Sequence, residues 1–142
     1  MTTINKGWVL ITGASGGFGE ECARQFTAQE KSLILVARRL TKLESMAQEL
    51  RESDKTEVIV EQVDLSDMFA ISDLHSRLKQ RNIVVDTLIN NAGQGLQGSF
   101  RDQPLNETLD MINLDIVSVT ALRPCNQIAE HENRVSSATL VS

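Results

Sequence analysis

Four glycines lie close together directly after a short apolar run, and their spacing suits the binding of a phosphate group. The segment Thr12–Gly19 reads Thr-Gly-Ala-Ser-Gly-Gly-Phe-Gly, and a stretch with helical spacing follows it. Glycine permits positive φ and lets the backbone approach a pyrophosphate, whose charge the amides at a helix N-terminus can hold. The contacts that we expect are Gly13, Ser15, Gly16, Gly17, Phe18 and Gly19.

The spacing of these glycines favours a dinucleotide over a nucleoside triphosphate. Gly13, Gly17 and Gly19 form the pattern Gly-xxx-Gly-x-Gly, which differs from Gly-x-Gly-x-x-Gly and lacks the Gly-Lys-Ser/Thr of a triphosphate loop. A tight turn from a strand into a helix also needs glycine for structural reasons alone. The strand expected before the loop and the helix expected after it favour the cofactor interpretation.

Two consecutive arginines follow the second apolar run, which ends Val36-Ala37-Arg38-Arg39. A dinucleotide-binding unit often has a carboxylate here, which accepts hydrogen bonds from the adenosine ribose hydroxyls. A carboxylate would repel a 2′-phosphate, whereas a guanidinium can bind one through two charge-assisted hydrogen bonds. We therefore expect NADP rather than NAD, with Arg38 as the main phosphate contact and Arg39 and the Ser15 hydroxyl beside it. Two solvated arginines are the alternative, although cations at the start of a helix oppose its dipole.

These residues need a scaffold of alternating strands and helices to hold them. Short runs rich in Val, Ile and Leu recur, each followed by a longer stretch with helical spacing, which predicts parallel strands joined by crossover helices. The expected strands are 8–12, 33–37, 58–63, 85–90 and 139–141, of which the last has the weakest pattern. The expected helices are 17–29, 40–51, 67–81 and one that follows Pro104.

Each expected helix has an apolar face that could pack on the sheet. The faces consist of Phe18, Cys22 and Phe26 in the first helix, of Leu43, Met46, Ala47 and Leu50 in the second, and of Phe69, Ile71, Leu74 and Leu78 in the third. Asp67 stands at the expected N-cap of the third helix. After Pro104, a continuous apolar stripe is predicted from Leu105, Leu109, Ile112, Ile116 and Val119.

Three motifs in this order resemble the short-chain dehydrogenase/reductase family. They are the Thr-Gly-xxx-Gly-x-Gly loop, the pair Asp64-Leu65 after the third strand, and Asn90-Asn-Ala-Gly93 after the fourth. The resemblance extends from Gly7 to about Leu122. It implies an α/β fold of the Rossmann type, with a doubly wound parallel sheet in the order 3-2-1-4 and possibly 5.

The resemblance also implies roles for individual residues. Asp64 would hydrogen-bond the adenine amino group, and the Leu65 backbone would lie beside the ring. Asn91, Ala92 and Gly93 would line the cofactor ribose, although Asn-Ala-Gly is also a turn-forming sequence. Asn113 matches the family asparagine that helps to relay protons, and its alternative role is to cap a local backbone carbonyl.

The sequence departs from the family at the reaction centre. Family members use a Ser, a Tyr and a Lys, and this sequence contains no Tyr. Proton transfer to a forming alkoxide needs a positioned group with a suitable pKa. If 139–141 is the fifth strand, the family serine would fall beyond Ser142. Ser136 and Ser137 are alternative matches to that serine, but the polar run before them has a poor strand pattern. We expect the chain to be inactive alone.

Composition narrows the classes of function. A length of 142 residues fits a single domain, 1–142, that is incomplete relative to the family. The formal charge of −5 argues against nucleic acid. No apolar run is long enough for a bilayer, and no signal-like segment opens the sequence, so we expect a cytoplasmic protein without a membrane partner. Cys22 and Cys125 fit two reduced structural thiols, and no metal site is expected.

The leading hypothesis is the cofactor-binding part of an NADP-dependent oxidoreductase. It would move hydride between NADP(H) and a small carbonyl or alcohol substrate of the parent protein. A non-catalytic NADP-binding or interaction module is the alternative, and a methyltransferase-type Rossmann domain is disfavoured by Arg38-Arg39 and Asn90–Gly93. An apolar parallel strand left at the edge of the sheet would favour a homo-oligomer.

Overall fold

A five-stranded parallel sheet forms the centre of the molecule. The computed structural model describes residues 7–54, 56–92, 102, 104–112, 122 and 136–139. The elements are β1 (Trp8–Thr12), α1 (Gly17–Ala28), β2 (Ser32–Ala37), α2 (Leu40–Asp54), β3 (Val58–Gln62), α3 (Met68–Gln80), β4 (Val85–Asn90), α4 (Leu105–Ile112) and β5 (Ser136–Thr139). The strand order is β3-β2-β1-β4-β5 with every pair parallel, which confirms the expected doubly wound α/β fold.

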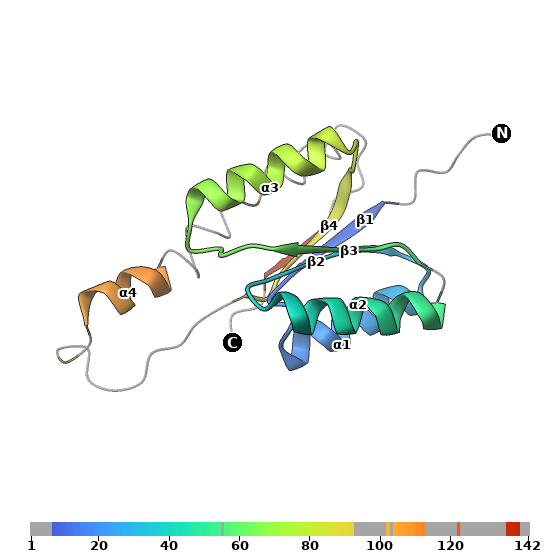
Figure 1. Cartoon of the computed structure of the whole chain (residues 1–142), viewed down its shortest axis with the longest axis horizontal. Coiled ribbons are helices and arrows are strands. Elements are labelled where there is room, and N and C mark those ends of the chain that lie inside the picture. The colour runs from blue at the N-terminus through green and yellow to red at the C-terminus, as the bar shows by residue number, and fades with distance from the viewer. Residues whose placement is uncertain are drawn as a thin grey trace.

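Helices cover both faces of the sheet. α1 and α2 lie on one face and α3 on the other (Figure 1). Successive strand residues point to opposite faces, so Val9 and Ile11 pack toward α1 and α2 whereas Leu10 packs toward α3. The strands are therefore apolar on both faces, as a parallel sheet covered by helices requires.

The buried face of α1 differs from the expected one. Phe18 is 58% exposed, while Gly19, Ala23 and Thr27 are the fully buried positions of this helix. Small side chains at these positions let the helix backbone lie close to the sheet, and the larger Cys22 and Phe26 pack only partly against the core. The α2 face is as predicted, since Leu43, Met46, Ala47 and Leu50 are all buried.

The start of α3 also departs from expectation. Asp67 is the N-cap, as predicted, and its carboxylate accepts a hydrogen bond from the Phe69 amide. Ile71, Leu74 and Leu78 are buried, but Phe69 is 83% exposed, so its assignment to the core was wrong. A residue at the second position of this helix points away from the face on which the residues at 71, 74 and 78 lie.

The described part of α4 does not pack its apolar stripe on the sheet. Leu105, Leu109 and Ile112 are 73%, 49% and 37% exposed. In Figure 1 this helix stands beyond the carboxyl ends of the strands. The prediction that this stripe packs on the sheet is therefore wrong for these three residues. Ile116 and Val119 lie outside the described residues.

The fifth strand begins three residues earlier than predicted. It comprises Ser136–Thr139 rather than 139–141, and Thr87 to Asn90 pair with it in order. Thr139 pairs with Asn90, the last residue of β4. Its polar sequence gives no strand pattern, so pairing with the exposed edge of β4 decides its position. Among the described helices, none is long and apolar enough to cross a bilayer.

Candidate cofactor-binding site

The loops after β1 and β4 meet at the carboxyl edge of the sheet. β1 lies between β2 and β4 in the sheet. The helix that follows β1, α1, and the helix that precedes β4, α3, lie on opposite faces (Figure 1). Open parallel sheets bind ligands in the crevice that such a reversal of strand order creates. The glycine loop begins at this point, after Thr12, and Asn91 and Ala92 lie opposite it.

A pocket of about 500 Å³ lies at this edge. Its lining comes from the ends of four strands and the starts of two helices. The lining residues are Gly13, Ser15, Gly16, Gly17, Phe18, Ala37, Arg38, Arg39, Lys42, Val63, Leu65, Asn91 and Ala92. Ten of the residues expected from the sequence to contact a dinucleotide therefore share one pocket.

The two loops of the crevice are joined through the Thr12 side chain. Thr12 is buried, and its hydroxyl accepts hydrogen bonds from the amides of Asn91 and Ala92, each at 3.0 Å. The Asn91 side-chain amide donates in turn to the Gly13 carbonyl at 3.2 Å. These bonds link segments almost eighty residues apart in sequence and fix the separation of the two pocket walls.

Two of the loop glycines are required by internal packing. Gly13 has a φ of +62°, and a Cβ there would meet the Ala92 backbone at 2.9 Å. A Cβ on Gly19 would lie 2.6 Å from the Gly13 carbonyl oxygen and 2.8 Å from the Asn91 amide nitrogen. Gly19 is buried behind the pocket rather than lining it. Packing therefore requires a glycine here, and a contact of Gly19 with a ligand stays a prediction.

Packing within the described part of the chain does not require a glycine at the other two positions of the loop, Gly16 and Gly17. A Cβ on Gly16 would make only an ordinary contact of 3.6 Å, and one on Gly17 would meet no described atom within 4 Å. Both positions face the pocket at the start of α1. No described side chain caps this helix, whose N-cap is Gly16. The first amides of α1 and the open space above them suit the close approach of an anionic group such as pyrophosphate.

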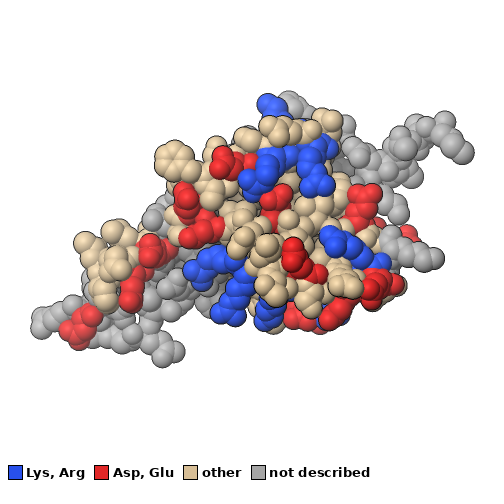
Figure 2. Space-filling view, viewed as in Figure 1, with Lys and Arg blue, Asp and Glu red and all other residues tan. Residues whose placement is uncertain are grey.

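Three cations also line the pocket. Arg38 and Arg39 lie between β2 and α2, and Lys42 lies in the first turn of α2. Figure 2 shows basic side chains gathered beside the amino end of α2. This first turn contains no acidic residue, so its three neighbouring positive charges lie at the positive end of the helix dipole. A phosphate group is a suitable counter-ion for such a wall.

Asp64 lies next to the pocket but not in its lining. Its Oδ1 accepts hydrogen bonds from the Ser66 hydroxyl at 2.6 Å and the Ser66 amide at 3.0 Å. These bonds, together with the nearby Arg38 guanidinium, lower the pKa of the Asp64 carboxyl despite an opposing effect of desolvation. The bonds also shape the turn that places Leu65 in the pocket wall.

Two expected site residues lie outside the described residues, namely Gly93 and Asn113.

The sequence analysis missed three residues that line the pocket, Lys42, Ala37 and Val63. Lys42 follows Arg39 by three residues at the start of a helix, and this spacing was the available signal. Among the described residues, no group of His, Cys, Asp or Glu could hold a metal ion.

The chain matches the family model of short chain dehydrogenases over residues 7–134. It is 32% identical over 124 residues to an NADP-dependent 3-hydroxy acid dehydrogenase of Schizosaccharomyces pombe, covering 86% of this chain and 48% of that protein. It is 40% identical over 104 residues to the dehydrogenase/reductase SDR family member 7B of Bos taurus, covering 70% of this chain and 32% of that protein. The chain thus spans half or less of the curated relatives that it matches.

Solved structures show the same fold. A short-chain dehydrogenase from Sphingobium yanoikuyae in complex with NADPH has a TM-score of 0.88 and 29% identity, covering 96% of this chain and 53% of that one. A bulky-bulky ketone specific alcohol dehydrogenase from Comamonas testosteroni has a TM-score of 0.88 and 30% identity, covering 97% and 55%. An alcohol dehydrogenase from Thermococcus sibiricus, complexed with 5-hydroxy-NADP, has a TM-score of 0.86 and 26% identity, covering 94% and 57%.

Proposed function

This chain belongs to the short-chain dehydrogenase family, and from that premise we propose that its pocket at the carboxyl edge of the sheet holds NADP(H) for an oxidoreductase. The single observation that carries the proposal is the shared pocket of the glycine loop, the two arginines and the residues after β4. The S. pombe relative is described as NADP-dependent, and two of the similar structures contain NADPH or an NADP derivative.

The glycine loop would hold the pyrophosphate. Gly16 and Gly17 leave their backbone open to the pocket, so the amides at the start of α1 can reach phosphate oxygens directly. Asn91 and Thr12 fix this loop against the end of β4. The loop is therefore held in place before a ligand arrives, which reduces the entropy lost on binding.

The cationic wall would select NADP over NAD. Arg38 can bind the 2′-phosphate through paired charge-assisted hydrogen bonds, and Arg39 and the Ser15 hydroxyl lie in the same pocket. NAD offers these cations only ribose hydroxyls, and among the described residues that line the pocket there is no carboxylate to accept their hydrogen bonds. Leu65 and Val63 supply the apolar surface beside which an adenine ring would lie.

The bound nicotinamide would supply hydride transfer to or from a small carbonyl or alcohol. This sequence contains no Tyr to transfer the accompanying proton. Asn113, which matches the family relay asparagine, would have only an auxiliary role. We therefore assign cofactor binding and cofactor orientation to these 142 residues, and assign the complete reaction to the parent protein.

Calorimetric titration of the chain with NADP⁺ and NAD⁺ tests the proposal. We expect the wild type to bind NADP⁺ at least tenfold more tightly, because one charge-assisted hydrogen-bonded contact contributes about 1.5–3 kcal/mol. Arg38→Ala should remove most of this preference and leave NAD⁺ affinity nearly unchanged. Arg81→Ala is the matched control, because Arg81 lies at the C-cap of α3 and does not line this pocket. A folded wild type that binds both nucleotides equally would contradict the proposal.

A non-catalytic cofactor-binding module is the second candidate, and the absence of Tyr favours it. Oxidation of NADPH, followed by its absorbance with a panel of small ketones, separates the two. We expect this chain alone to give no turnover above the rate without protein. Steady turnover would show that residues other than the family Tyr carry the proton.

A further inference from the structure

We propose that Lys42 is a third determinant of NADP specificity, which binds the 2′-phosphate together with Arg38 and Arg39. This inference rests on the proposed function and deepens it. Neither the glycine loop nor the family motifs include Lys42. The fold places Lys42 in the lining of the pocket.

The start of α2 brings the three cations together. The Leu43 amide donates to the Arg39 carbonyl at 3.2 Å, so Arg39 directly precedes the first turn of α2 and accepts a hydrogen bond from it. Lys42 follows it by three residues, and residues three apart lie on the same side of a helix. Arg38 is held at its backbone, where its carbonyl accepts a hydrogen bond from the Gln62 side chain at 3.0 Å. All three side chains belong to exposed residues beside the pocket.

Their charge calls for an anion. The salt bridges found within the described part of the chain join Arg24 to Glu20 and Glu49, and Arg77 to Glu61. None of these involves the three pocket cations. Asp64 is close enough to interact with Arg38, but it accepts hydrogen bonds from Ser66. Lys42 therefore adds a positive charge at the amino end of a helix, where it opposes the dipole and gains no described carboxylate partner.

A 2′-phosphate has the charge to use all three cations. Near neutral pH a phosphate monoester carries close to two negative charges and has three strong acceptor oxygens. Two guanidinium groups can bind some of these oxygens, and the flexible ammonium of Lys42, in the first turn of α2, can bind a further oxygen as a point charge. The pyrophosphate would instead be held at the start of α1, by backbone amides.

The test compares ligands that differ only by the 2′-phosphate. Affinities of the full chain for NADP⁺ and NAD⁺, and for adenosine 2′,5′-bisphosphate and AMP, are measured by calorimetry in wild type, Lys42→Gln and Lys42→Arg. We expect Lys42→Gln to weaken NADP⁺ and the bisphosphate roughly tenfold, as the loss of one charge-assisted contact implies. NAD⁺ and AMP should change less than about twofold, and Lys42→Arg should retain most of the affinity.

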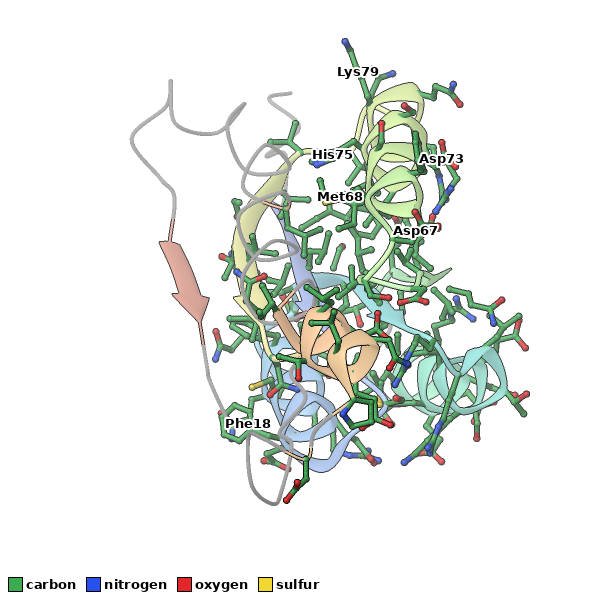
Figure 3. All side chains as sticks on the ribbon, turned by 90° about the vertical axis from the view of Figure 1, so that its left-hand side faces the viewer. Phe18, Asp67, Met68, Asp73, His75 and Lys79 are labelled. Atoms are coloured by element: carbon green, nitrogen blue, oxygen red, sulfur yellow. The ribbon has the colours of Figure 1, made fainter. Side chains whose placement is uncertain are left out.

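Lys79→Gln is the matched control, since it removes the same charge elsewhere. Lys79 lies in the last turn of α3, at the opposite end of that helix from Asp67 (Figure 3). We expect it to leave all four affinities unchanged. Both Gln variants are exposed helical substitutions, and circular dichroism verifies that they fold.

The possible failures are distinguishable. If a folded wild type does not prefer NADP⁺, the proposed function itself fails. If Arg38→Ala removes the preference but Lys42→Gln leaves it intact, only the role of Lys42 is overturned. An equal weakening of NADP⁺ and NAD⁺ by Lys42→Gln also overturns it, because Lys42 would then act on a group that both nucleotides share.

Discussion

Gly19 is a glycine because the Gly13 carbonyl and the Asn91 side chain leave no room for a Cβ atom. Gly17, two residues earlier, has open space where a Cβ atom would lie, and it faces the pocket. The two residues belong to one motif but have different physical reasons to be glycine. Packing explains the first, and in the proposed function the approach of a ligand to the backbone would explain the second.

Gly17→Ala should therefore separate binding from stability. We expect the free energy of unfolding to stay the same or to rise by up to about 1 kcal/mol, because alanine restricts the unfolded chain. Dinucleotide affinity should fall roughly tenfold, since the new methyl group occupies space beside the first amides of α1. Urea denaturation and calorimetric titration measure the two effects. Undiminished affinity would show that no ligand comes close to this backbone.

Gly19→Ala is the comparison variant, and it should destabilise the protein. A Cβ 2.6 Å from the Gly13 carbonyl forces the loop away from β4 and costs about 1–3 kcal/mol. Both the midpoint of urea denaturation and the nucleotide affinity should fall. A variant as stable as the wild type would mean that α1 can shift away from the sheet at little cost.

At the scale of whole elements, helix α3 offers a test of which side chains form the core. Leu74 is fully buried, whereas Phe69 on the same helix is 83% exposed. We expect Leu74→Ala to lower the free energy of unfolding by about 2–5 kcal/mol, the usual cost of a cavity left by a buried leucine. Phe69→Ala should change it by less than about 0.5 kcal/mol, as is usual for exposed positions. Urea denaturation of both variants measures the difference, and similar losses would place Phe69 in the core.

The elements also show where periodic patterns are reliable. The apolar face of α2 was predicted correctly because its three large side chains and Ala47 recur at helical spacing and are all buried in the core. The apolar pattern of α1 predicted the wrong buried face. It pointed to the large side chains of Phe18 and Phe26, whereas the small residues Gly19, Ala23 and Thr27 occupy the buried face. A close approach between a helix and a sheet favours small residues, and a hydrophobicity pattern gives these little weight.

At the scale of the molecule, the pocket forms only when both halves of the sheet are assembled. Its walls come from residues near the start of the chain and from Asn91 and Ala92, joined through Thr12. A ligand in this pocket binds the folded state alone, so it should stabilise the fold by mass action.

Thermal melts with each nucleotide test this coupling. At a concentration of 100 times its dissociation constant, a ligand contributes about 2.7 kcal/mol. We expect NADP⁺ to raise the melting temperature by several degrees and NAD⁺, at the same concentration, to raise it less. In Arg38→Ala the two shifts should become similar. A melting temperature independent of both nucleotides would indicate that the pocket does not bind them.

The sequence by itself determined the order of strands and helices, the glycine loop and the two arginines. These features depend on neighbouring residues, because backbone freedom, helix dipoles and apolar periodicity act over a few positions. The bounds of β1 and β4 agree with the predicted ones for the same reason.

Only the tertiary structure decided which residues share the pocket and what each contributes. It placed Lys42 in the pocket with the two arginines, showed that packing requires a glycine at Gly19, and showed that Thr12 links the two loops. It also set the position of β5, whose polar sequence gains strand structure through pairing with β4. These outcomes depend on contacts between segments far apart in the chain, and the strength of such contacts is not encoded in any local pattern.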